Sequence, residues 1–232
     1  MSKAIIFLFI TFFTLVSSSY AQVPSKREYK GTFNSYHLLF NAEYDFNYNY
    51  NLSSILESRG LPSFEDKPMV FGAGINYLID RQMVRIDFNI NYQKKNEEAF
   101  VAKQRLNVFG LTWGYNVLKS NSWILAPYVG PRVRILNFKY TEKLPELNFE
   151  QLLDYNPNDL SLRYSKVSLD LGLTIAHQNF HHVEIRAGYN VPITKNRWWD
   201  ANRVNSYSGI SNYMTGWYVR LAIGIGSKGA DL

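Results

Sequence analysis

The stretch YHLLFNAEYDFNYN, residues 36–49, decides the fold because its side chains alternate in chemical character. The even positions are all apolar or aromatic: Tyr36, Leu38, Phe40, Ala42, Tyr44, Phe46 and Tyr48. The odd positions are polar in all but one case: His37, Leu39, Asn41, Glu43, Asp45, Asn47 and Asn49. A period of two held over this length is typical of a β-strand with two different faces. At about 3.3 Å per residue, such a strand is long enough to cross a membrane hydrocarbon layer at a tilt.

The chain begins with a pattern typical of a secretory signal peptide. A positive start at Lys3 is followed by an apolar run over residues 4–16 and by small residues up to Ala21. We predict cleavage after Ala21, which leaves a single domain over residues 22–232. An uncleaved membrane anchor is the alternative, but the apolar run is short for a spanning helix.

The composition narrows the class of partner. Aromatic residues make up 16% of the chain and charged residues only 19%, which is unusual for a soluble exported protein. The net charge is +6, but the basic residues include no run of four or more, so nucleic acid is a poor partner. Anionic outer-membrane lipid headgroups or lipopolysaccharide phosphates are a reasonable one. Because the chain has no cysteine, disulfides and lipid attachment at a cysteine are excluded.

The alternation of the first stretch recurs in seven further segments. They are residues 69–79, 84–93, 108–117, 123–138, 167–175, 183–191 and 217–226. The connections alternate between short, at 80–82, 119–122 and 177–182, and long, at 51–67, 94–103, 139–162 and 192–213. This order predicts an all-β fold, an eight-stranded antiparallel up-and-down transmembrane β-barrel with external long loops and both termini periplasmic.

The polar faces of the strands indicate which side faces the lumen. A soluble lipocalin-like barrel also alternates, but with its polar face in water. Here the polar faces carry small residues that suit a crowded interior: Gly72, Gly74, Gly110, Gly114, Gly130, Gly172, Gly188 and Gly224. The apolar faces carry no charge in the strand cores, and aromatic residues gather at both strand ends, as a bilayer requires. We therefore expect the apolar faces to contact lipid.

Two prolines fit this scheme less well. Pro127 and Pro131 both lie in the predicted strand at 123–138. A closed barrel has no edge at which a missing N–H donor is harmless, so we expect a β-bulge or local irregularity there.

The signal sequence, the eight alternating strands and the closing GWYVRLAIGI of residues 216–225 carry a resemblance to a known family. The chain resembles the small eight-stranded outer-membrane β-barrel proteins of Gram-negative bacteria, the group that includes the barrel domain of outer-membrane protein A. The resemblance implies insertion by the barrel-assembly machinery through the last strand. The chain departs from the usual insertion signal, because residues 227–232 follow that strand without a terminal aromatic residue. Since the family is functionally mixed, it implies no particular activity.

An inward polar face places a set of charged side chains in the lumen. They are Glu43, Asp45, Arg85, Asp87, Arg132, Arg134, Asp170, Glu184, Arg186 and Arg220. We interpret them as ion pairs packed inside a barrel too narrow for an open pore. A gated ion path whose pairs exchange partners is the alternative.

The rival class is an enzyme that modifies lipid or lipopolysaccharide, with His, Ser and Asp near the external loops. His37, His177, His181 and His182 are all predicted on the periplasmic side, which argues against such a site. We assign no catalytic residue and no cofactor. We also assign no metal site, because neighbours such as His181 and His182 rarely ligate together without other donors nearby.

The last long loop offers the best candidate for external contact, through Arg197, Trp198, Trp199 and Arg203. Arginine beside tryptophan suits sugar or phosphate recognition, although both tryptophans could equally anchor the loop at the headgroup layer. We therefore predict an outer-membrane barrel with a structural or surface-interaction role and no enzymatic activity. A small gated channel and a lipid-directed enzyme are the alternatives.

Overall fold

The computed structural model describes residues 34–46, 48–50, 57, 64, 69–118, 122–143, 160–178, 181–194, 198–200, 206–207, 212–214 and 216–228. The predicted signal peptide lies outside these ranges. Within them, no helix is long and apolar enough to span a membrane.

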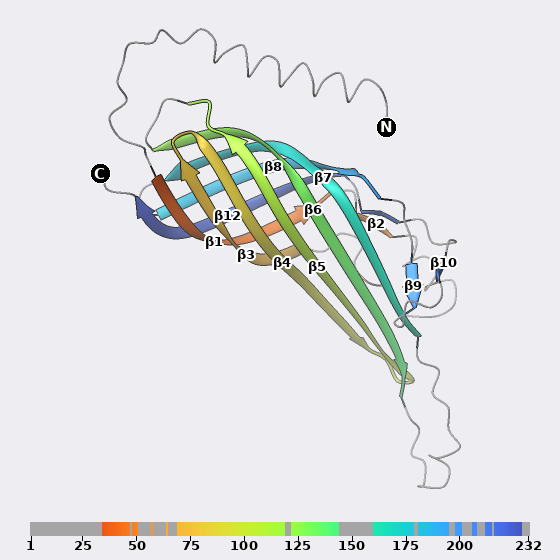
Figure 1. Cartoon of the computed structure of the whole chain (residues 1–232). Helices are drawn as coiled ribbons and strands as arrows, with labels where there is room; N and C mark the ends of the chain where they lie inside the picture. Colours follow the sequence, from red (N-terminus) through yellow and green to blue (C-terminus); the bar gives the residue numbers. More distant parts are fainter. Residues whose placement is uncertain are drawn as a thin grey trace, which may run out of the picture. The chain divides into compact units, whose positions relative to one another are not determined.

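Eight long antiparallel strands form a closed barrel (Figure 1). Their bounds are β1 Asn34–Asp45, β3 Met69–Ile79, β4 Gln82–Asn96, β5 Phe100–Tyr115, β6 Trp123–Glu142, β7 Leu160–Gln178, β8 His181–Pro192 and β12 Trp217–Lys228. Each of these strands pairs with the next one along the chain, and β1 pairs with β12 to complete the ring. The prediction of an eight-stranded antiparallel up-and-down barrel is confirmed.

The apolar faces of the strands point outward and the charged faces point inward. On β12, Leu221 is 56% exposed, whereas its neighbour Arg220 is 1% exposed. Aromatic rings meet on the outer surface at both ends of the barrel, as in the pair Tyr189 and Trp217 at the loop end and the pair Tyr36 and Tyr77 at the turn end. This polarity is the reverse of that of a soluble barrel and matches a barrel that faces hydrocarbon.

Pro127 and Pro131 cause a local irregularity, as expected, but no bulge. The β6–β7 register runs through both prolines without an offset. The β5–β6 ladder is interrupted, because it lacks a partner for Pro131 and stops before Pro127. The two strands nevertheless stay close, since a Cβ added at Gly130 would lie 2.7 Å from the Cα of Thr112. Because Gly130 has no side chain, β6 can lie this close to β5 beside Pro131, and the register continues without the extra residue of a bulge.

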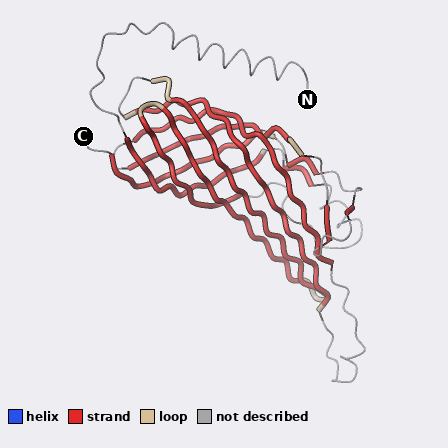
Figure 2. The backbone as a smooth tube through the Cα atoms, viewed as in Figure 1, coloured by secondary structure: helices blue, strands red, loops and turns tan. Residues whose placement is uncertain are grey.

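Strands β4 to β7 continue past the rim of the barrel as a four-stranded sheet (Figures 1 and 2). The β4–β5 pairing reaches Asn96 and Val101, and the β6–β7 pairing reaches Tyr140 and Leu160. We call this part the strand extension. The predicted polar loop at 94–103 is therefore wrong, because most of it belongs to β4 and β5.

The sequence pattern did not predict the strand extension, because its polar side chains face outward and its apolar side chains face inward, the reverse of the barrel. Lys94 and Lys103 face outward there, while Ala102 and Leu106 face inward and are buried. A search for apolar outward faces does not find such a segment, although the period of two persists.

Short strands accompany the long ones in the loops. The segment β2, Tyr48–Tyr50, pairs with β11, Asn212–Met214. The segment β9, Trp198–Asp200, pairs with β10, Ser206–Tyr207, and also with the edge of β7 in the strand extension.

The outward face of β12 allows a direct test of the lipid-facing surface. We expect Leu221→Arg to lower the free energy of unfolding in lipid vesicles by about 2–4 kcal/mol, because a charge near the bilayer midplane is poorly solvated. Leu221→Ala, which shortens the side chain without adding a charge, is the control. Urea unfolding in vesicles, followed by tryptophan fluorescence, measures both. Equal losses for the two variants would contradict a hydrocarbon environment.

Candidate functional site

The interior of the barrel is the most chemically distinctive part of the described structure. All ten charged residues predicted for the lumen lie inside, and each is at most 3% exposed. They come from six of the eight long strands, so residues far apart in the sequence meet there. Buried charges require close partners, because desolvation alone costs several kcal/mol per ion.

Glu43 on β1 lies within ion-pair distance of three arginines. Nη2 and Nε of Arg220 lie 2.6 and 2.9 Å from its Oε2, and Nη2 of Arg132 contacts its Oε1. Arg220 lies beside Glu43 in the β1–β12 ladder, whereas Arg132 reaches it from β6 across the lumen. Towards the loop end, Arg134 Nη2 lies 2.8 Å from Asp45 Oδ1 and 3.6 Å from Glu43 Oε1.

A second carboxylate cluster lies towards the turn end. Asp87 binds Arg85 Nε at 2.6 Å and Arg220 Nη1 at 2.7 Å. Arg85 also contacts Glu184, and Arg186 Nε lies 3.6 Å from that same carboxylate. Because Arg220 binds both Glu43 and Asp87, the two clusters form one continuous network.

Two tyrosines join this network and were not given a role from the sequence. The Tyr218 hydroxyl lies 2.7 Å from Asp170 Oδ2 and 2.7 Å from the Tyr128 hydroxyl. The guanidinium carbons of Arg132 and Arg186 lie 4.6 and 4.1 Å from the ring centroids of Tyr218 and Tyr128, respectively. Both cations therefore stack on aromatic faces as well as pairing with carboxylates.

Glycines make room for the tyrosine pair. Gly172 and Gly188 lie opposite each other on β7 and β8. A Cβ added at either glycine would collide with the Tyr128 hydroxyl, and one at Gly188 would lie 2.7 Å from the ring of Tyr218. The glycine-rich inner face noted in the sequence thus has a specific packing role here.

Further ionisable residues in the lumen were missed or misplaced. His182 was predicted in a turn, but it lies in β8 with its ring buried. Its Nε2 is 3.2 Å from Glu184 Oε2, and its ring centroid is 4.8 Å from that of His37. Lys166, also buried, lies two residues before Ser168 on the inner face of β7. His182 is two residues from Glu184, and Lys166 is four residues from Asp170, so each pair lies on the same face of its strand. Alternation in the sequence could therefore have placed both His182 and Lys166 in the lumen.

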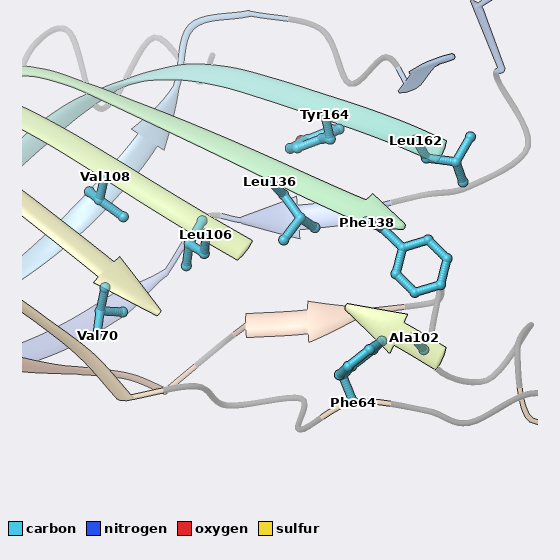
Figure 3. Close-up of a cluster of buried hydrophobic side chains, with 9 residues drawn as sticks. All are labelled: Phe64, Val70, Ala102, Leu106, Val108, Leu136, Phe138, Leu162 and Tyr164. Atoms are coloured by element: carbon cyan, nitrogen blue, oxygen red, sulfur yellow. The ribbon is translucent and has the colours of Figure 1, made fainter. Parts of the chain in front are cut away.

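Apolar side chains cover the charged network at both ends. Towards the turns, Leu78, Met83, Ile124, Ala126, Tyr128 and Ala176 form a buried cluster. Towards the loops, the strand extension supplies a second cluster, shown in Figure 3: Phe64, Val70, Ala102, Leu106, Val108, Leu136, Phe138, Leu162 and Tyr164. Phe64 comes from the loop after β2 and meets Phe138 edge-on at 5.7 Å.

The predicted external contact loop is only partly described. Trp198 and Trp199 lie in β9, whose backbone pairs with Tyr164 and Arg163 of β7. Arg197 and Arg203 lie outside the described residues. Within the described ranges, no group of three His, Asp or Glu side chains could hold a metal ion.

Comparisons with known proteins found solved structures of similar architecture but no matching family. No protein-family model and no curated protein matches the chain. A major outer membrane protein from Thermus thermophilus is 12% identical over 83% of this chain and 99% of that chain, with a TM-score of 0.45. The N-terminal β-barrel domain of Pseudomonas aeruginosa OprF is 10% identical over 85% and 99%, with a TM-score of 0.37. Neisserial surface protein A is 14% identical over 84% and 97%, with a TM-score of 0.42. The barrel assignment rests on this chain's own register and burial.

Neutralising the central carboxylate tests the energetic weight of the network. We expect Glu43→Gln to lower the free energy of unfolding by about 3–5 kcal/mol, because it leaves buried arginines without their counter-charge. Glu97→Gln, at the exposed β4–β5 turn, should change it by less than about 0.5 kcal/mol. Urea unfolding in vesicles measures both.

A compensating variant separates charge imbalance from lost packing. The double change Glu43→Gln with Arg132→Met should be less destabilising than the sum of the two single changes, since it removes a charge of each sign. Additive losses would show that the two side chains do not act as a pair.

Proposed function

We propose that this chain is an integral outer-membrane β-barrel protein with a structural or surface-interaction role. It has no enzymatic activity, its lumen is closed by arginine–carboxylate pairs, and both termini are periplasmic. Outer-membrane lipid and lipopolysaccharide surround it, and the barrel-assembly machinery inserts it.

The outer surface supports the membrane location. The exposed side chains of the strands are apolar over the middle of the barrel and aromatic near its ends. In water this surface would be an exposed hydrophobic patch far larger than a soluble monomer tolerates. In a bilayer the same surface is the stable one.

The single observation that carries closure is the position of the ion network between two apolar clusters. Arg220 links the two groups of carboxylates across the middle of the lumen. Ions following this path would have to break short ion pairs and also pass the buried side chains at each end. Both steps cost free energy, which favours a closed state over a permanent pore.

The absence of enzymatic activity is supported by where the histidines lie. His37 and His182 are buried near the turn end, and His182 is engaged with Glu184. A lipid-modifying site of the nucleophilic type requires an accessible base near the lipid surface at the loop end. Turnover of labelled phospholipid or lipopolysaccharide by the refolded protein would contradict this part of the proposal.

Planar-bilayer recording tests closure. We expect the refolded wild-type protein to show no steady conductance, because buried ion pairs cross the lumen. Arg132→Gln and Arg134→Gln are the informative variants, since both residues lie in the lumen and touch Glu43. A steady wild-type current whose size or ion selectivity changes in these variants would overturn the closed lumen and establish the gated channel.

Surface labelling tests the topology. A short tag inserted at Asn148, in the long loop after β6, should be reached by antibody on intact cells, because that loop is predicted external. A tag at Asn121, in the short turn before β6, should be reached only after the outer membrane is permeabilised. Both positions lie outside the described residues, so tagged proteins must also retain membrane insertion. The reverse labelling pattern would invert the proposed orientation.

A further inference from the structure

The outer face of the strand extension is strongly basic. Lys94, Lys103 and Lys139 lie in one cross-strand row on β4, β5 and β6. Arg105 and Arg163 lie in the next row towards the barrel, on β5 and β7, with Asn137 between them. We call the three lysines and two arginines the outer basic patch. The patch exists because most of residues 94–103 form strand rather than the predicted loop.

The arrangement of the lysines is unfavourable by itself. Lys94 is the direct partner of Lys103 in the β4–β5 register, and Lys103 is the direct partner of Lys139 in the β5–β6 register. Like charges directly opposite each other destabilise a sheet. An anion bound across the row would relieve this repulsion.

The described side chains around Lys94 and Lys103 do not supply that anion. Among the residues that the structure describes, no carboxylate lies within ion-pair distance of Lys94, Lys103, Arg105 or Arg163. The Nε of Arg105 donates to the neutral Asn107 side chain at 3.1 Å. Glu97 and Glu98 lie at the β4–β5 turn, beyond the patch. Lys94 and Lys103 therefore have no counter-charge among the described side chains, and an external anion would supply one.

The position of the patch along the strands indicates how far from the lipid-facing band its ligand would lie. On the same outer face, Phe88 and Phe109 are exposed and in ring contact at 4.9 Å, which marks the lipid-facing band. Arg105 precedes Phe109 by four residues on β5, roughly 13 Å along the strand. Tyr92, an exposed aromatic residue, is the direct partner of Arg105. The patch thus begins where the aromatic rim ends, at the depth of lipid headgroups.

We propose that the outer basic patch binds the phosphates of a phosphorylated glycolipid of the outer leaflet, the lipopolysaccharide class. This inference rests on the proposed outer-membrane location. The Cα atoms of Lys94 and Lys139 are two strands apart, roughly 10 Å, and the arginine row lies about 7 Å nearer the membrane. Cations spread over this area suit a headgroup with more than one phosphate, whereas a glycerophospholipid presents a single one. The ring of Tyr92 beside Arg105 suits a sugar face.

Binding to defined bilayers tests the proposal. The full chain is refolded into nanodiscs of zwitterionic phosphatidylcholine, and the probe is bis-phosphorylated lipid A, counted by native mass spectrometry. Lys94→Gln with Lys103→Gln should weaken binding about tenfold or more, because each cation near the surface contributes to attraction. Since these changes remove a repulsion, they should not unfold the extension.

A matched control removes the same charge from elsewhere in the extension. Lys95→Gln with Lys143→Gln changes one residue on the inner-facing side of β4 and one at the end of β6, and it should leave binding within about twofold of wild type. Equal weakening by both double variants would overturn the patch as the binding site.

Two further probes separate the ligand classes. Dephosphorylated lipid A and anionic phosphatidylglycerol should both bind at least about tenfold more weakly than the bis-phosphorylated probe. Equal binding of the dephosphorylated form, or of phosphatidylglycerol, would overturn the specific proposal. The surface-labelling test of the topology does not depend on lipid binding, so failure of the patch and failure of the proposed outer-membrane orientation are distinguishable.

Discussion

The rest of the structure depends on the pairing of buried charge across the lumen. Glu43 receives one arginine from the neighbouring strand β12 and another from β6 on the other side of the barrel. Such contacts form only when the sheet is closed, since an open sheet would leave these charges unpaired or in lipid. Burial of ions is costly, so the network contributes specificity for this closure more surely than it contributes stability.

The second constraint is the limited space inside the barrel, which glycine residues on the inner faces relieve. The tyrosine pair that binds Asp170 fits only because Gly172 and Gly188 face each other on neighbouring strands. Arg132 and Arg186 stack on the two rings and also contact the carboxylates Glu43 and Glu184, respectively. Small residues, aromatic rings and arginine side chains therefore share this narrow interior.

The strands keep their period of two while the chemistry of their faces reverses at the rim. In the barrel, the outer side is apolar and the inner side charged. In the strand extension, Lys94 and Lys103 face outward, while Leu106 and Phe138 are buried inside. The reversal follows from the change of solvent, from hydrocarbon to water, along one continuous strand. It also places the outer basic patch beside the lipid headgroups and the second apolar cluster above the ion network.

The sequence by itself determined the strand order, the inward direction of residues such as Glu43 and Arg220, and the outward direction of residues such as Leu221. These follow from local alternation, which has the same period wherever a strand lies. Only the tertiary structure decided which arginine binds which carboxylate, how Gly130 accommodates Pro131, and that Lys94 and Lys103 share a row. Each of those depends on the stagger between strands, which the alternation within a single strand does not specify by itself.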